Sequence, residues 1–176
     1  MCHSRRRTCS LSSGRREPEV NDIQFTLNGK EAAYSGSAAD RLLEVLRNVY
    51  HCMSVKCGCK EGECGACSVL IDGILYNSCC VAMGAVEGSS IVTMEGFRET
   101  EHFAVLDRAF GEVSAVQCGF CTPGMLLAAE ALLSGNPHPD EEEIREGLSG
   151  NLCRCTGYNA IVNAVKKAAE EGNGLW

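Results

Sequence analysis

Two stretches of alternating apolar and polar residues open the patterned part of the chain. Residues 23–27, IQFTL, alternate with a period of two, which is the repeat of a strand with one buried face. Asn28-Gly29 follows directly, and this dipeptide is a strong hairpin signal because both residues tolerate positive φ angles. The pattern predicts a hairpin whose second strand covers residues 31–34.

A helical repeat replaces the alternation after Ser37. Four apolar residues recur at helical spacing: Leu42, Leu43, Leu46 and Val49. Because Ser is a good N-cap residue, we predict a helix that starts at Ser37, runs to about Tyr50 and buries these four side chains.

Three further strands are predicted downstream. Residues 68–71, SVLI, and 74–76, ILY, flank the turn Asp72-Gly73, and residues 91–94, IVTM, close the sheet. Together with the first hairpin and the helix, these strands predict a small mixed sheet crossed by one helix, the β-grasp arrangement, over residues 20–96.

The second half of the chain has helical periodicity only. Apolar residues repeat around Phe103–Val113, Met125–Leu133 and Ile161–Ala168. Gly135-Asn136-Pro137 stops the second of these helices, and Asp140 with Glu143 predicts a capping box for another that ends near Gly150. We therefore predict a four-helix bundle over residues 100–172, so that the whole chain has the α+β fold class.

Composition excludes several classes of function. The chain has 176 residues, 45% of them hydrophobic and 22% charged, as in an ordinary globular protein. The net charge is −7, although residues 1–20 hold five arginines against two glutamates, so the body is acidic and unsuited to nucleic acid. Residues 1–19 are predicted to be a disordered basic leader. No apolar run reaches membrane-spanning length or follows Arg5-Arg6-Arg7 as an export signal, so we predict no membrane association and a cytoplasmic location.

The 13 cysteines need a chemical explanation. Disulfide scaffolds are short, loop-rich secreted chains, whereas this chain has the apolar content to form its own core. A cytosolic protein rich in cysteine more often binds metal. The remaining alternatives are a zinc site and an iron–sulfur cluster.

The stretch CGCKEGECGAC, residues 57–67, favours iron–sulfur. Cys59, Cys64 and Cys67 have the C-x4-C-x2-C spacing of plant-type [2Fe–2S] ferredoxins, and Cys79 follows as the fourth ligand. A loop can wrap such a cluster only if its backbone takes unusual dihedrals and approaches the sulfurs closely, and three glycines allow this: Gly58, Gly62 and Gly65. A zinc knuckle would instead prefer two C-x2-C pairs.

A second set of cysteines lies in the helical half. Cys118 and Cys121 precede a predicted helix opened by Thr122-Pro123, and Cys153 and Cys155 precede one opened by Thr156-Gly157. The partial positive charge of two helix N-termini would suit an anionic thiolate cluster. Taken alone, C-x2-C with C-x-C leaves zinc open as an alternative, in a zinc-binding interaction module.

Taken together, the two quartets point to a protein family more specifically than either quartet does alone. The phrases GCKEGECGACSVLIDG with Ser78-Cys79, QCGFCTPGM and GNLCRCTGY resemble the small [2Fe–2S] subunit of molybdenum hydroxylases, the xanthine dehydrogenase family. The phrasing is most similar to the iron–sulfur subunits of bacterial xanthine dehydrogenases. The resemblance covers roughly residues 20 to 170.

The resemblance implies that this chain transfers electrons and catalyses no reaction itself. Electrons would pass from molybdopterin on a large subunit, through two [2Fe–2S] clusters here, to FAD on a medium subunit, in a hetero-oligomer that is a dimer of heterotrimers. The substrate would be a purine or related N-heterocycle; the alternatives are an aldehyde, an aromatic acyl-CoA, nicotinate or CO. The resemblance places Gln117 and Cys155 against the pterin. We further expect the helical quartet to lie deeper than the plant-type loop, beneath an apolar shell.

Some residues depart from the pattern. Cys2, Cys9, Cys52, Cys57 and Cys80 have no motif role and are interpreted as free thiols. No histidine falls in a C-x-H pattern, which argues against a Rieske centre with its two histidine ligands.

Overall fold

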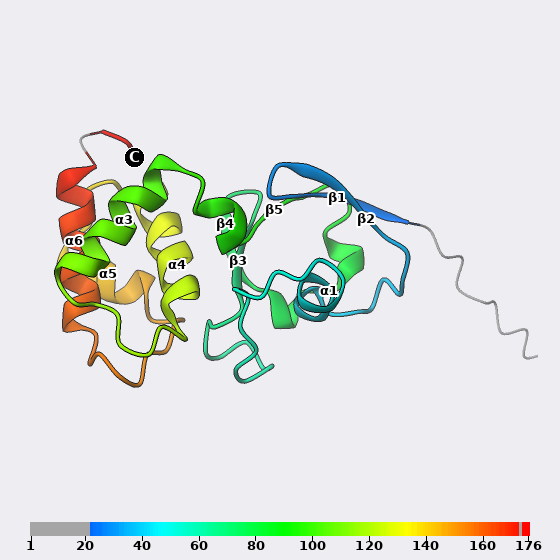
Figure 1. The fold of residues 1–176 in the computed structure, drawn as a ribbon, viewed down its shortest axis with the longest axis horizontal. Helices are drawn as coiled ribbons and strands as arrows, with labels where there is room; N and C mark the ends of the chain where they lie inside the picture. Colours follow the sequence, from blue (N-terminus) through cyan, green and yellow to red (C-terminus); the bar gives the residue numbers. More distant parts are fainter. Residues whose placement is uncertain (1–21, 173) are drawn as a thin grey trace, which may run out of the picture.

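The computed structural model describes residues 22–172 and 174–176, so the leader at 1–19, with Cys2 and Cys9, lies outside the described residues. The described chain has a sheet half and a helical half, which lie side by side along the longest axis of the molecule (Figure 1). Within the described ranges, we find no helix with the length and apolar character that crossing a membrane requires.

The sheet half contains five strands: β1 (Ile23–Leu27), β2 (Lys30–Tyr34), β3 (Ser68–Ile71), β4 (Ile74–Asn77) and β5 (Ser90–Val92). Their order is β2-β1-β5-β3-β4, with β1 and β5 parallel and the other neighbours antiparallel. Both predicted turns are confirmed by positive φ angles, 51° and 77° at Asn28-Gly29 and 51° and 82° at Asp72-Gly73. The predicted strand at 91–94 is too long, because Met94 begins the short helix α2 (Met94–Phe97).

Helix α1 (Leu42–Asn48) starts later than predicted. The Ser37 hydroxyl accepts from the Ala39 N–H at 3.2 Å, and Asp40 Oδ2 accepts from the Ser37 N–H at 3.1 Å, so this segment closes a turn of its own. The buried side chains of α1 are those of Leu42, Leu43, Val45 and Leu46, so Val45 is buried where Val49 was predicted to be. Val49 is 51% exposed, so its assignment to the core was wrong.

The four predicted helices of the second half are confirmed. They are α3 (Glu101–Glu112), α4 (Thr122–Gly135), α5 (Glu141–Gly147) and α6 (Asn159–Glu171). The predicted capping box is present at the start of α5, where Asp140 Oδ1 accepts from the Glu143 N–H at 2.9 Å and the Glu143 carboxylate accepts from the Asp140 N–H at 2.7 Å. This helix ends at Gly147 rather than near Gly150. Two 3-10 turns, Ser78–Cys80 and Met83–Ala85, complete the sheet half.

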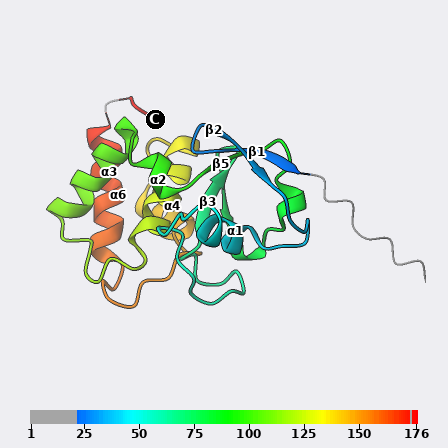
Figure 2. The same ribbon diagram turned by 45° about the vertical axis from the view of Figure 1, so that its right-hand side comes forward.

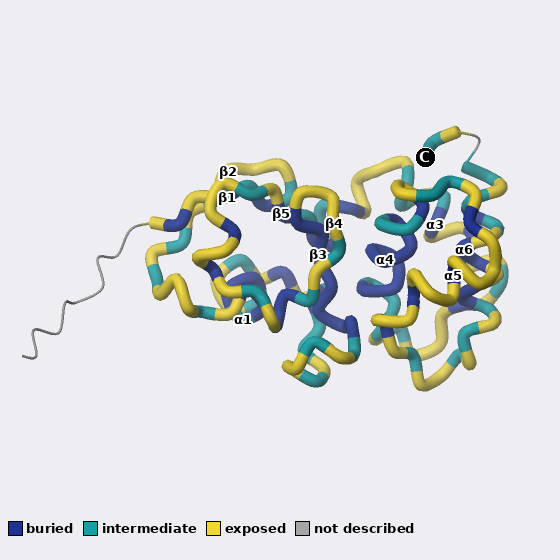
Figure 3. Tube along the Cα trace, turned by 180° about the vertical axis from the view of Figure 1, so that it is seen from behind, coloured by how far each residue is buried: buried dark blue, intermediate teal, exposed yellow. Residues whose placement is uncertain are grey.

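Strand β3 joins the two halves because both of its faces are buried. Val69 and Ile71 belong to the apolar cluster formed with α1, whereas Leu70 belongs to the cluster formed with the helices. Successive side chains of a strand point to opposite faces, so α1 and α4 pack on opposite sides of β3 (Figure 2). Figure 3 shows α4 and β3 as the buried centre of the molecule. The loops that carry the cysteines leave this centre on one common side (Figure 1).

Candidate metal centres

The first quartet is assembled by the loop between α1 and β3 together with the β3–β4 hairpin. Cys59, Cys64 and Cys67 lie on the loop, and Cys79 lies in the 3-10 turn after β4. The hairpin register pairs Ser68 with Asn77, and the Cys67 carbonyl oxygen accepts from the N–H of Ser78 at 3.2 Å and from its hydroxyl at 2.7 Å. Cys79 is thereby delivered to Cys67, and their thiols interact.

Glycines in this loop allow unusual backbone dihedrals and a close approach to a sulfur, the two purposes inferred from the sequence. Gly62 and Gly65 have φ angles of 81° and 64°, which most side chains avoid. Gly58 has an ordinary φ angle, but a Cβ added there would lie 2.6 Å from the Cys64 Sγ. The loop therefore needs glycine for its conformation at two positions and for space beside a sulfur at the third.

Backbone N–H groups of the loop point at two of the sulfurs. The Glu61 N–H donates to the Cys59 Sγ at 3.4 Å, and the Cys59 N–H donates to the Cys64 Sγ at 3.4 Å. The Glu61 N–H, followed by the donors of Cys64, lowers the pKa of Cys59 to about 7. Burial raises the pKa of Cys79, and the neighbouring Cys67 adds to this effect. The loop therefore stabilises a thiolate at its exposed end and holds a protonated thiol at its buried end before metal binds.

The second quartet comes from the segments that precede α4 and α6. Cys121 is the N-cap of α4, with Pro123 in the first turn, while Tyr158 with a φ of 69° caps α6. Helix α4 therefore opens at Thr122-Pro123 as predicted, whereas α6 opens at Asn159, two residues after the predicted start at Thr156-Gly157. The Cys118 and Cys155 sulfurs are 3.8 Å apart, and the thiols of Cys121 and Cys153 interact.

The protonation of this quartet is also uneven. Burial, followed by contact with Cys153, raises the pKa of Cys121 to about 12. Burial opposes ionisation of Cys153 as well, but the Thr156 hydroxyl, whose oxygen is 3.1 Å from the sulfur, and nearby N–H groups lower its pKa overall. Because metal ligands must be thiolates, iron binding at these four cysteines would release protons, the Cys121 proton above all.

The helical quartet is the more exposed of the two, which corrects the expectation that it lies deeper. Cys118 and Cys155 are exposed, whereas Cys67 and Cys79 are buried. The cysteines of this quartet lie on the loops that precede α4 and α6. The apolar side chains nearest them in sequence, Phe120 and Leu152, are themselves exposed. Among the described residues, Cys118 and Cys155 are therefore left uncovered, whereas Cys121 and Cys153 pack at the edge of the helical core.

The eight cysteines are gathered as pairs. Among residues 22–172 and 174–176, no group of three or more His, Cys, Asp or Glu side chains is close enough to hold one metal ion. The Cys118 and Cys155 sulfurs are 3.8 Å apart, and in Cys59–Cys64, Cys67–Cys79 and Cys121–Cys153 one thiol is close enough to shift the pKa of the other. A [2Fe–2S] cluster places two thiolates on each of two irons, so two pairs in each half are the donor set that it requires. A single zinc ion would need four donors around one point.

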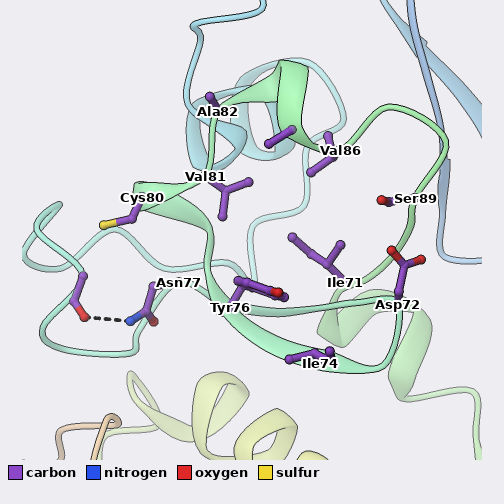
Figure 4. Close-up of a pocket in the computed structure, with 12 residues that line it drawn as sticks. Ile71, Asp72, Ile74, Tyr76, Asn77, Cys80, Val81, Ala82, Val86 and Ser89 are labelled. Atoms are coloured by element: carbon purple, nitrogen blue, oxygen red, sulfur yellow. Dashed lines mark hydrogen bonds between the residues drawn. The ribbon is translucent and has the colours of Figure 1, made fainter.

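The cysteines without a motif role lie apart from these pairs, with one exception. Cys52 is buried in the apolar cluster of the sheet half, and Cys57 packs at its edge. The Cys80 Sγ lies 3.7 Å from the Cys79 Sγ, but it is exposed and lines a shallow groove of about 750 Å³ (Figure 4). Since Cys79 is the thiol that contacts Cys67, the geometry favours Cys79 as the fourth ligand.

Backbone hydrogen bonding brings the two quartets together. The Leu152 N–H donates to the Cys64 carbonyl oxygen at 2.9 Å, so the residue before Cys153 bonds directly to a residue of the first quartet. Gln117 is exposed and directly precedes Cys118. Sequence reasoning missed the junction, because no local pattern signals a contact between distant loops.

Comparison with known proteins agrees with two clusters. Residues 25–88 match a family of 2Fe-2S iron-sulfur cluster binding domains, and residues 93–166 match a [2Fe-2S] binding domain. The chain is 48% identical to the nicotinate dehydrogenase small FeS subunit of Eubacterium barkeri over 84% of this chain and 94% of that protein. It is 43% identical to the xanthine dehydrogenase iron-sulfur-binding subunit of Escherichia coli O157:H7, over 84% and 93%.

The chain belongs to the iron–sulfur subunits of the molybdenum hydroxylases. A solved structure of quinoline 2-oxidoreductase from Pseudomonas putida 86 superimposes with a TM-score of 0.80 at 41% identity, covering 87% of this chain and 96% of that chain. As a member of this family, the subunit carries two [2Fe–2S] clusters and transfers electrons within an oxidoreductase complex, without a substrate site of its own. The predicted fold class, an α+β chain with a ferredoxin-like sheet half and a helical second half, is confirmed.

Proposed function

We propose that this subunit relays electrons from a molybdopterin site on a large partner to FAD on a medium partner, in a xanthine dehydrogenase-like hydroxylase that acts on purines or related N-heterocycles. The observation that carries the relay is the bond between Leu152 and Cys64, which brings the two cysteine loops into direct contact. The purine assignment rests on the resemblance to bacterial xanthine dehydrogenases and on the name of the Escherichia coli relative.

Each quartet is proposed to bind one cluster. Cys59, Cys64, Cys67 and Cys79 would hold the plant-type cluster, and Cys118, Cys121, Cys153 and Cys155 would hold the second. Each bound cluster accepts and releases one electron at a time. This chain's own part is to hold the sulfurs in pairs and to supply N–H donors to them, as Glu61 does for Cys59. The two cluster-binding domains would correspond to residues 20–96 and 100–172.

The exposed face of the second quartet supports the placement of the molybdopterin partner. Cys118 and Cys155 are exposed, and the apolar side chains of Val116, Phe120 and Leu152 are 41%, 48% and 54% exposed beside them in sequence. An exposed pair of ligands with an apolar rim is suited to burial by a partner. Gln117 would then face the pterin together with Cys155.

The groove beside Cys80 supports a second partner at the plant-type cluster. Figure 4 shows Tyr76, Val81 and Val86 among the side chains that line it, and Ile74 at its edge is 60% exposed. The groove lies along β4, the edge strand of the sheet. We assign it to the medium, FAD-binding subunit, so that electrons enter at the helical quartet and leave at the plant-type quartet.

Two partner faces imply a hetero-oligomer, for which we propose a dimer of heterotrimers located in the cytoplasm. The interfaces should bury on the order of 2,000 Å² or more in total, as stable assemblies do.

A second candidate, a nicotinate hydroxylase of the same family, is favoured by the 48% identity to the Eubacterium barkeri subunit. Hydroxylases of aldehydes, aromatic acyl-CoA or CO are the further alternatives within the family.

Purification from the native host with its partners tests this function. We expect two co-eluting chains, one binding molybdopterin and one binding FAD, and four irons with four sulfides per copy of this subunit. Hypoxanthine or xanthine should bleach the visible absorption of both clusters under anaerobic conditions. Bleaching by nicotinate alone would select the second candidate, and a stable isolated monomer containing zinc would contradict the proposal.

A further inference from the structure

Asn151 lies where the two cysteine loops meet, and its side chain is buried, with only 3% of the residue exposed. Its Nδ2 donates to the Gly65 carbonyl oxygen at 3.0 Å and to the Ser68 hydroxyl at 3.1 Å. Gly65 and Ser68 belong to the segment around Cys67, whereas Asn151 precedes Cys153 by two residues. One buried amide therefore reaches from the segment of the second quartet into the loop of the first.

The space around this amide is closed on two sides. A Cβ added to Gly65 would lie 2.5 Å from Asn151 Nδ2 and would also collide with the Gly150 carbonyl oxygen. A Cβ added to Gly124, in the first turn of α4, would collide with the Gly65 carbonyl oxygen. The plant-type loop is thus held between α4 and the Asn151 segment with no room to shift, because packed atoms cannot be displaced cheaply.

The Asn151 backbone is tied to Cys153 as firmly as its side chain is tied to Gly65. The Tyr158 hydroxyl donates to the Asn151 carbonyl oxygen at 3.2 Å and accepts from the Cys153 N–H at 2.9 Å. The Asn151 N–H itself donates to the Leu148 carbonyl oxygen at 3.0 Å. A displacement of Asn151 would therefore be passed to a cluster ligand on one side and to the plant-type loop on the other.

We propose that Asn151 is a positioning residue that fixes the two cysteine loops against each other and thereby sets the electronic coupling between the two clusters. This inference rests on the proposed function, in which each quartet holds one cluster. The step concerned is the passage of one electron from the reduced cluster to the oxidised one, with no other reactant. Asn151 contacts neither substrate nor thiol, so its effect is exerted through Gly65 and Cys153.

Asn151→Asp in the purified complex tests the proposal. The change keeps the shape of the side chain, removes both N–H donors and places a carboxylate oxygen against the Gly65 carbonyl oxygen. We expect both clusters to keep their own EPR signals, while the magnetic interaction between the two reduced clusters weakens and electron transfer between them slows. Hydrogen exchange at the Leu152 amide should accelerate about tenfold, which corresponds to about 1.4 kcal/mol. Asn163→Asp, on an exposed position of α6, is the matched control and should change none of these.

Two further variants keep the test decisive if Asn151→Asp loses iron. Ser68→Ala removes one acceptor of the same amide, and Gly124→Ala pushes on Gly65 from the opposite side. Both should weaken the magnetic interaction, and the effects of Asn151→Asp and Ser68→Ala should not add, because the residues act as a unit. If all variants lower stability but leave the magnetic interaction unchanged, Asn151 has a structural role only and the inference is overturned. A wild-type complex without two clusters would instead overturn the proposed function.

Discussion

The backbone N–H of Leu152 donates a 2.9 Å hydrogen bond to the carbonyl oxygen of Cys64. This bond joins the loop between α1 and β3 to the segment between α5 and α6. Cys64 of the first quartet is one of the bonded residues, and Cys153 of the second quartet directly follows the other. Both loops are further held by α4, whose first turn packs on Gly65. A two-centre relay requires such a junction because electrons must cross between the halves without a mobile carrier.

Replacing Cys79 and Cys80 separately will identify the fourth ligand of the plant-type cluster. Cys79→Ser should abolish or strongly alter the EPR signal of this cluster, because Cys79 is the buried thiol in contact with Cys67. Cys80→Ser is the matched control and should leave the signal intact, since Cys80 is the exposed one of the two neighbouring thiols. The opposite result would mean that the ligand is displaced by one position.

The Gly65 position should tolerate no side chain. Gly65→Ala combines an unfavourable φ of 64° with a collision against the Asn151 segment, so we expect loss of iron and a large fall in thermal stability. Gly88→Ala has a similar φ of 73° and open space around the added Cβ, so it should cost only about 1–2 kcal/mol and keep both clusters. Iron analysis and thermal melts of the two variants measure the difference. Equal behaviour would show that the junction is not close-packed.

The order of the relay can be tested with Cys155→Ala. If the helical quartet receives electrons first, this change should block reduction of the plant-type cluster by substrate, while reduction from the flavin side by NADH survives. Rapid-freeze EPR of the intact complex follows both routes. Reduction of the plant-type cluster by substrate at the normal rate would show that the order is different.

Glu95 should make stability depend on acid pH. Burial opposes its ionisation, but hydrogen bonds from Ser54 and Thr93 prevail and hold its pKa below the ordinary 4.5. Because the folded pKa is lowered, the stabilisation is present above pH 4.5 and is lost as pH falls through the folded pKa. Glu95→Gln should therefore cost on the order of 1–2 kcal/mol at pH 7, and the difference from wild type should shrink in acid.

Urea unfolding at a series of pH values measures this effect. The exposed Glu99, which is close in sequence, provides the control variant Glu99→Gln, which should change stability little at any pH. A constant difference between Glu95→Gln and wild type across the acid range would contradict the assignment.

Several features escaped prediction because they depend on competition between local and distant contacts. Ser37 is a good N-cap residue, but its N–H donates to the Asp40 carboxylate in a turn, and the helix starts only at Leu42. The same helix turns Val45 rather than Val49 towards the sheet. The helical quartet was expected to be covered, yet its loops extend beyond the bundle, and helical periodicity carries no information about what covers the end of a bundle.

The sequence by itself determined the hairpin turns and the spacing of the eight cysteines within their motifs, because each of these depends on residues close together in the chain. Asn28-Gly29 and Asp72-Gly73 encode their hairpins locally, and the second hairpin determines where Cys79 lies relative to Cys67. Only the tertiary structure decided that the two cysteine-bearing loops touch. That contact requires Leu70 to be buried against the helices and Asn151 to reach Gly65 across the junction, and both depend on the packing of α4 against β3 rather than on any local preference.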